Sequence, residues 1–193
     1  SDVCSSDLHH GFMVHDQLYA LDASLTPRPQ MVQGHEQSDD RLSWRFTLRD
    51  GLWFHDGDPV RAADCVATII RWSKRDLFGQ RMASQWQEIR ALDDRQFEIR
   101  LKKPFPHMLL ALASGTCLIM PARLANPDIT QQVKEAVGSG PYRFLPGEWD
   151  PGSHVAYTRF DRYHPRSEPP SLTSGGKVAR MERSEEHTSE LQS

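Results

Sequence analysis

The clearest pattern along the chain lies in residues 42–49, where apolar and polar side chains alternate strictly. Trp44, Phe46 and Leu48 fall on one face, and Arg45, Thr47 and Arg49 fall on the other. Alternate side chains of an extended strand point to opposite faces, so this is the period of a half-buried strand. We therefore predict a strand with an aromatic buried face at this position.

Beyond two turns the hydrophobic period becomes that of a helix. The turns are Asp50-Gly51 and residues 55–59, in which glycine accepts a positive φ and aspartate bonds nearby backbone amides. Over residues 61–75 the apolar side chains form one broad face: Cys65, Val66, Ile69, Ile70 and Trp72. That face is typical of a buried helix, so the segment predicts a strand-turn-helix unit.

The rest of the chain alternates between helical and extended patterns, which indicates a mixed α/β fold class. The predicted elements are a short helix within 11–20, a strand over 31–36 paired with 43–49, a helix over 79–87 ending at Trp86, a hairpin of 89–92 with 96–101, a helix over 107–113, a buried strand over 117–120, and a hairpin running from Tyr142 through Pro151-Gly152 to Arg159.

Residues 44–69 resemble the extracytoplasmic solute-binding proteins of peptide-type ABC importers, the family 5 binding proteins, which take dipeptides, oligopeptides, nickel and related solutes. The matching positions are Arg49, Gly51, Phe54, His55, Asp56, Gly57, Pro59, Ala62 and Asp64. A second match is Gly138-Ser139-Gly140-Pro141-Tyr142, and the whole resemblance runs from Tyr19 to Tyr163. One departure is Arg61, which stands where the family usually has a helix-capping Thr or Asn.

The resemblance implies a partial periplasmic-binding-protein-like fold. In that family two α/β lobes are joined by a hinge and bury the ligand between them. Residues 9–60 would start the first lobe, residues 61–137 would form an inserted helical and hairpin subdomain, and residues 138–182 would return to the first lobe. The second lobe would be missing from this chain.

Both ends of the chain have an unusual composition. Residues 1–8 and 183–193 resemble the two translations of a common sequencing-library adapter, and we expect both to be artefacts rather than structure. Two genuine polar tails are the alternative. Without these ends the chain has 21 acidic and 22 basic residues, so its formal net charge moves from −3 to about +1.

The near-neutral charge gives no electrostatic argument for binding to nucleic acid or to an anionic membrane. No run of 18 apolar residues is present, so the sequence predicts no transmembrane span. No signal peptide is present either, and a family member would then have to be truncated. Cys65 and Cys117 are compatible with a disulfide, but we favour two buried thiols because both lie among apolar residues.

His55-Asp56 is the one pair that suggests metal chemistry. A turn, with Asp56 accepting from backbone amides ahead of Gly57, is the simpler interpretation. The nine histidines include no zinc-protease spacing, and no Cys-x-x-Cys occurs. Gly138-Ser139-Gly140 lacks the lysine of a phosphate loop. We therefore predict no catalytic residue, metal or cofactor.

The function implied by the resemblance is capture of a small solute such as a peptide, in the periplasm, for delivery to the membrane permease of an ABC transporter. The protein would be a monomer without enzymatic activity. Tyr19, Trp86 and Met120 lie where family members bring the chain toward the cleft, although each also suits the core. A metal-dependent hydrolase using His55 and Asp56, or a free-standing interaction domain, are the other hypotheses.

Overall fold

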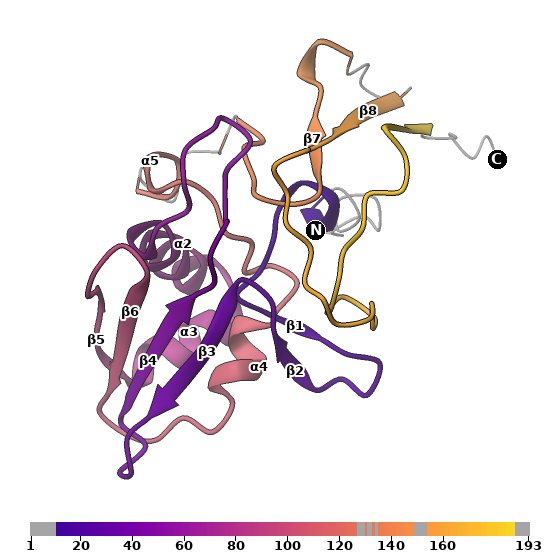
Figure 1. The fold of residues 1–193 in the computed structure, drawn as a ribbon. Coiled ribbons are helices and arrows are strands. Elements are labelled where there is room, and N and C mark those ends of the chain that lie inside the picture. The colour runs from indigo at the N-terminus through magenta and orange to yellow at the C-terminus, as the bar shows by residue number, and fades with distance from the viewer. Residues whose placement is uncertain (1–10, 127–129, 131–132, 134, 149–153, 188–193) are drawn as a thin grey trace, which may run out of the picture.

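The computed structural model describes residues 11–126, 130, 133, 135–148 and 154–187, and the side chains of these residues except 154, 155 and 183–187. Its centre is a four-stranded antiparallel sheet in the order β3-β4-β6-β5 (Figure 1). The strands are β3 (Val32–Gln37), β4 (Ser43–Leu48), β6 (Gln96–Leu101) and β5 (Trp86–Ala91). Helices α2 (Ala62–Arg75) and α3 (Leu77–Gln85) lie along one face of this sheet.

The remaining elements lie beside this unit or at one end of it (Figure 1). They are the hairpin β1 (Tyr19–Leu21) and β2 (Pro27–Pro29), the short helices α4 (Met108–Leu112) and α5 (Ala122–Ala125), the 3-10 helix η1 (Pro146–Glu148), and a three-stranded sheet of β7 (Tyr142–Phe144), β8 (His154–Arg159) and β9 (Arg183–His187). Residues 11–14 are helical. No helix in the described part of the chain combines the length and the apolarity that crossing a membrane requires.

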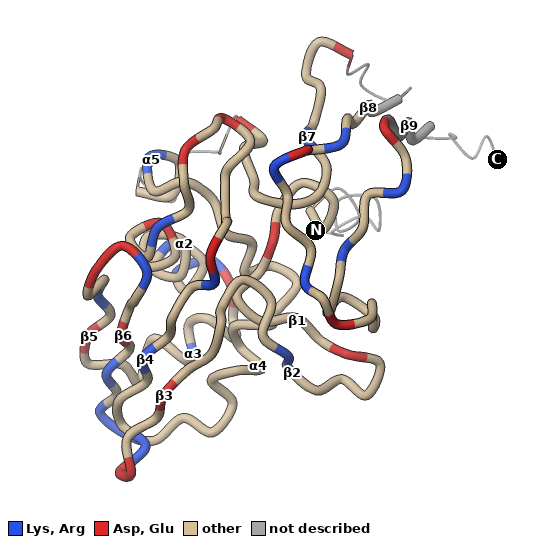
Figure 2. Tube along the Cα trace, viewed as in Figure 1, with Lys and Arg blue, Asp and Glu red and all other residues tan. Residues whose placement is uncertain are grey.

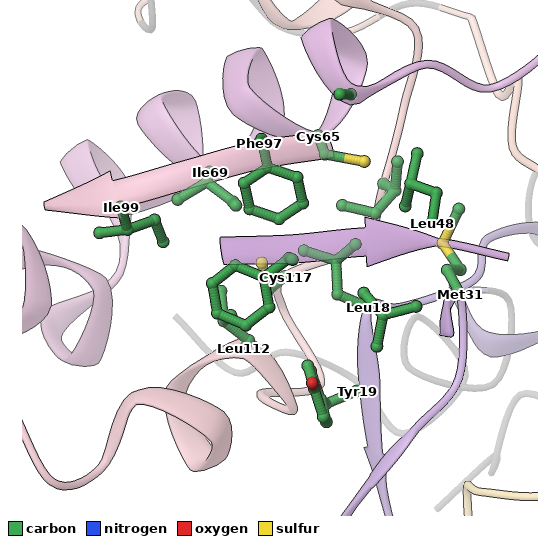
Figure 3. Packing of buried hydrophobic residues seen from close by; sticks show 14 of the residues in the cluster. Leu18, Tyr19, Met31, Leu48, Cys65, Ile69, Phe97, Ile99, Leu112 and Cys117 are labelled. Atoms are coloured by element: carbon green, nitrogen blue, oxygen red, sulfur yellow. The ribbon is translucent and has the colours of Figure 1, made fainter. Parts of the chain in front are cut away.

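The hydrophobic core fills the space between the sheet and α2. Alternate side chains of β4 and β6 are buried there, and the rings of Phe46 and Phe97 stack with their centroids 5.0 Å apart. Figure 3 shows Cys65 and Ile69 of α2 lying against Phe97 and Ile99 of β6. Full burial of such side chains stabilises a fold by roughly 1.5–3 kcal/mol each. The strand-turn-helix unit predicted from the hydrophobic pattern is therefore confirmed.

The start of α2 agrees with what the sequence indicates for Arg61. The backbone N–H of Arg61 donates to Asp64 Oδ2 at 2.8 Å, which is one half of a capping box. The other half needs an acceptor on the residue before the helix, and a guanidinium has none. The helix nevertheless begins at Ala62, because Asp64 Oδ1 also accepts from the Ala122 amide and fixes this end against α5.

One predicted element is wrong, and another is shorter than predicted. Residues 117–120 are buried in part but form no strand, since the backbone of Met120 bonds with Thr68 Oγ1 instead of a neighbouring strand. The helix within 11–20 ends after Val14. Beyond it the carbonyls of Gln17 and Leu18 accept from Met31 and Gln30, so tertiary pairing overrides the helical pattern.

The second helix is also shifted. It begins at Leu77, because the Asp76 carboxylate caps it by accepting from the amides of Phe78 and Gly79. Trp86 is consequently the first residue of β5 and not the end of the helix. The turn Pro151-Gly152 lies outside the described residues.

Both cysteines in the described part of the chain are reduced and buried. Burial raises the pKa of the Cys117 thiol to about 12, and it raises the pKa of Cys65 well above the ordinary range. Both side chains therefore stay as neutral thiols and serve as small apolar core residues. This agrees with the buried-thiol interpretation and not with a disulfide.

Residues 138–140 cross the backbone of residues 13–15 at very short range. A Cβ built on Gly138 would lie 2.0 Å from the Val14 carbonyl oxygen, and one on Gly140 would lie 2.6 Å from the Met13 carbonyl oxygen. The Gly140 amide donates to the Val14 carbonyl at 2.9 Å. Only glycine allows this approach, which explains why the motif has glycine at both positions.

We expect Gly138→Ala to lower the free energy of unfolding by about 3 kcal/mol, because the added methyl meets rigid backbone. Gly147→Ala is the matched control, since a Cβ there has no neighbour within 4 Å and its change should stay within about 0.5 kcal/mol. Urea titration followed by tryptophan fluorescence measures both. Equal stability of the two variants would contradict the proposed steric constraint.

Candidate functional site

A concave site with mostly apolar walls lies where the first and last described parts of the chain meet. It is a cavity of about 530 Å³, a volume within the usual range for small-molecule sites. Phe12 belongs to the helical residues 11–14, and Tyr142 begins β7. Leu172, Thr173 and Lys177 come from the segment that follows β8. The walls are thus mostly apolar, with one ammonium group.

Two local structures bring these walls together. The contact between Gly140 and Val14 places the start of β7 against residues 11–14. The segment after β8 is held by Thr173, whose amide donates to the Leu21 carbonyl while its Oγ1 accepts from the Leu21 amide at 3.0 Å. Gly175 has a φ of 82°, so it turns this segment where other residues would be strained.

A buried ion pair lies beside the cavity. Asp16 is 0% exposed, and its Oδ1 accepts from Lys177 Nζ at 2.9 Å and from the Gln17 amide at 3.0 Å. Its Oδ2 accepts from the Tyr163 hydroxyl at 3.1 Å. A buried carboxylate is tolerated only when it is paired and hydrogen-bonded, and these three donors satisfy that requirement.

The groups around Asp16 act as hydrogen-bond donors. Burial, reinforced by the negative charge of Asp16, raises the pKa of Tyr163 above its ordinary value. Tyr163 therefore remains a neutral donor to Asp16. Lys177 has three N–H donors and gives one to Asp16, so the others remain for an acceptor in the cavity that Lys177 lines.

The residues singled out as a metal pair form a turn, as the simpler interpretation predicts. Asp56 Oδ1 accepts from the Asp58 amide at 3.2 Å, and Asp56 Oδ2 pairs with Arg123 at 2.9 Å. His55 is buried, and its Nε2 lies 3.0 Å from the Gly140 carbonyl oxygen. Within the described ranges no three His, Cys, Asp or Glu side chains are placed to hold a metal ion.

The three expected ligand contacts lie on separate elements and none lines the cavity. Tyr19 is 1% exposed, its hydroxyl bonds with His35 Nδ1 at 2.7 Å, and its ring meets the Phe46 ring edge-on. Trp86 is half-buried at the start of β5. Met120 is half-buried, with its backbone held by Thr68. Their contact with a solute stays a prediction, and for Tyr19 the geometry favours the core alternative.

Sequence reasoning missed Asp16 and Lys177. Asp16 lies between Val14 and Leu18, inside an apolar stretch, and a carboxylate in such a stretch needs a partner when it is buried. That was the available signal. Its partner is 161 residues away along the chain and follows a Pro-, Ser- and Gly-rich segment without periodic pattern, so the pairing could not be inferred.

Charged residues of both signs lie along β4, β5 and β6, as the colours in Figure 2 show. Glu98, with its side chain 8% exposed, accepts from Ser43 at 2.9 Å and pairs with Arg90 at 3.2 Å and Arg100 at 3.9 Å. Burial alone would raise the pKa of Glu98, but these bonds and charges outweigh it and lower the pKa. Such a mixed network forms no basic surface for nucleic acid.

Removing the ammonium group next to Asp16 should destabilise the protein. We expect Lys177→Met to lower the free energy of unfolding by about 3 kcal/mol, because Asp16 remains buried without its counter-charge. Lys74→Met, at an exposed position in the last turn of α2, is the control and should change little. Chemical denaturation of both variants measures the difference. An unchanged free energy of unfolding in Lys177→Met would show that the ion pair contributes no stability.

Stability should also depend on pH through His55. Burial, together with the positive charge of Arg143, lowers the pKa of His55, and the bond to Gly140 only partly opposes this. The unfolded chain, with a histidine pKa of about 6.5, therefore binds more protons. The free energy of unfolding should fall as the pH drops through about 6.5 and then through the lowered pKa.

Urea titrations at a series of pH values measure this loss of stability. His55→Gln is the comparison, because its amide can still donate to Gly140 but does not titrate. The loss at acidic pH should be smaller in that variant. An identical pH dependence in the two proteins would exclude His55 as its source.

Comparison with known proteins gives consistent similarities. The family description "Bacterial extracellular solute-binding proteins, family 5 Middle" matches residues 26–181. A probable peptide ABC transporter periplasmic-binding protein of Sinorhizobium fredii is 41% identical over 174 residues, which are 90% of this chain and 33% of that protein. A glutathione-binding protein of Pectobacterium atrosepticum is 30% identical over 153 residues, 76% of this chain and 28% of that protein.

Among solved structures, NikA from Brucella suis in complex with Fe(III)-EDTA superposes with a TM-score of 0.76 at 24% identity, over 94% of this chain and 34% of that one. The fold is thus a mixed α/β arrangement found in periplasmic binding proteins. The chain spans about a third of the length of the relatives it matches.

Proposed function

Because the chain belongs to the bacterial extracellular solute-binding proteins of family 5, which are non-enzymatic transporter components, we propose that it takes part in capturing a small periplasmic solute for uptake through an ABC transporter. The observation that carries this proposal is the apolar cavity of about 530 Å³ with Lys177 on its wall. Mostly apolar walls with a few fixed polar groups are typical of solute sites.

The solute class that suits this cavity bears a carboxylate next to an apolar group. Lys177 is oriented by Asp16 and retains donors for a second acceptor. Phe12 and Leu172 supply apolar surface in the same cavity. Relatives are named for peptides and glutathione, and NikA carries Fe(III)-EDTA, all of which contain carboxylates. A peptide or a similar carboxylate is therefore the proposed cargo.

The proposed mechanism is capture between two lobes. We assign residues 9–60 and 138–182 to one lobe and residues 61–137 to a subdomain inserted in it. The bonds of Gly140 to Val14 and of Thr173 to Leu21 support this assignment, because they join the first and last parts of the chain. A second lobe would close over the cavity and exclude water. The solute would then shift the equilibrium toward the closed form by as much as it binds that form more tightly than the open one.

The test is a titration of the isotope-labelled chain with a dipeptide and with glutathione, followed by NMR. We expect saturable shifts at Tyr142, Thr173 and Lys177, with a Kd weaker than about 1 mM, because this chain forms only part of the proposed cleft. The dipeptide amidated at its C-terminus is the matched control and should bind more weakly.

Shifts confined to other parts of the chain, or equal binding of the amidated dipeptide, would reject the proposed role of Lys177. Micromolar binding measured by calorimetry would contradict the proposal that a second lobe completes the site. Stoichiometric zinc or manganese in the purified protein would instead favour the hydrolase hypothesis for His55 and Asp56.

A further inference from the structure

A second hollow lies at the end of the four-stranded sheet where the β3–β4 hairpin meets the segment after β6, at the bottom of Figure 1. Its volume is about 300 Å³, and it is lined by Gln37, Arg41, Trp44, Pro104, Phe105 and Pro106. It shares no lining residue with the cavity beside Lys177. The two sites are therefore separate.

The indole N–H of Trp44 is the first sign of a missing ligand. Trp44 is 6% exposed, and its Nε1 is buried without a hydrogen-bond partner in the described part of the chain. Buried donors are nearly always paired, and an unpaired one costs about 1–3 kcal/mol. Trp44 also lines the hollow, so an acceptor bound there would recover this free energy if the indole ring turned to present its N–H.

Arg41 and Gln37 add two further donors to the same hollow. Gln37 lies directly opposite Trp44 in the β3–β4 register. Arg41 is held at the hairpin turn, with φ of 59° and its amide bonded to the Ser38 carbonyl at 2.8 Å. The neighbouring carboxylate of Asp40 accepts from Ser38 and from the Leu42 amide instead. No side-chain hydrogen bond or ion pair of Arg41 or Gln37 occurs among the described residues.

The opposite wall of the hollow is apolar and preformed. The ring of Phe105 is half-buried and is fixed by edge contacts with Phe78 and His107, at centroid distances of 6.3 and 6.1 Å. Pro104 and Pro106 flank it, and the fixed φ of proline limits how far this segment can move. A small apolar side chain can therefore pack on Phe105 without rearranging the protein.

We propose that this hollow binds a small free carboxylate that bears one apolar group. Its oxygens accept hydrogen bonds from the Arg41 guanidinium and the Trp44 indole N–H, and its apolar group packs on Phe105. A guanidinium favours a carboxylate because charge-assisted bonds are about twice as strong as neutral ones. The volume suits a molecule the size of one amino-acid residue. This site is independent of the solute capture proposed above.

The test follows the indole ¹⁵N–¹H resonance of Trp44 during titration of the full chain with phenylacetate. The resonance is assigned by its loss in Trp44→Phe. We expect a saturable shift with phenylacetate. The apparent affinity should be at least tenfold weaker for the neutral phenylacetamide, and the affinity for phenylacetate should fall by a similar factor in Arg41→Gln. Arg75→Gln, at another exposed arginine, is the control and should bind as the parent protein does.

Absence of a saturable shift would overturn the proposal. Equal binding of phenylacetamide, or unchanged binding in Arg41→Gln, would overturn the role of the charge. Binding of N-acetyl-Gly-Phe without binding of phenylacetate would overturn the proposal of a small free carboxylate and indicate that the hollow binds the C-terminus of a peptide. Arg41 is exposed, so Arg41→Gln keeps the test decisive even if Trp44→Phe destabilises the fold.

Discussion

The close backbone contact at Gly138 and Gly140 is the constraint on which the rest of the arrangement depends. These glycines are bonded to two other segments, since the Gly138 carbonyl accepts from the His55 amide at 2.9 Å and the Gly140 amide donates to the Val14 carbonyl. Three segments that are distant in sequence therefore meet at one point. The walls of the larger cavity are in position only because this crossing brings β7 against residues 11–14.

The protein uses two kinds of interaction to hold its parts together. The sheet and α2 are joined by apolar burial, which is non-directional and tolerates variation in side-chain shape. The first and last parts of the chain are joined by directional bonds, chiefly those of Asp16, Thr173 and Gly140. Directional bonds fix the orientation of Lys177, and a binding site needs a fixed orientation more than it needs stability.

Much of the sheet and its main helix could be predicted from the sequence, and most of the site could not. Alternation at Trp44, Phe46 and Leu48 is a local signal, because the strand period is contained within a few residues. The Gly-Ser-Gly motif was recognisable through its resemblance to the family, and the close backbone contacts that explain its glycines appeared only in the structure. The Asp16–Lys177 pair depends on a long-range contact that no local pattern encodes. The predicted strand over residues 117–120 is wrong because the backbone of this segment bonds with Thr68, which is distant in the sequence.

The two hollows differ in whether their positively charged side chain is paired with a carboxylate, and this difference affects which ligands each can bind. Lys177 is tied to a buried carboxylate, so a ligand there meets an ion pair and gains less from charge than it would from an unpaired ammonium group. Apolar contact and shape therefore add to its selectivity, beside the hydrogen bonds that the remaining Lys177 donors give to a carboxylate. Arg41 has no such partner among the described residues, and the unpaired Trp44 donor lies beside it. In the proposed scheme the smaller hollow therefore depends mainly on the charge of its ligand, whereas the larger one combines a carboxylate contact with the ligand's apolar surface and with closure by a second lobe.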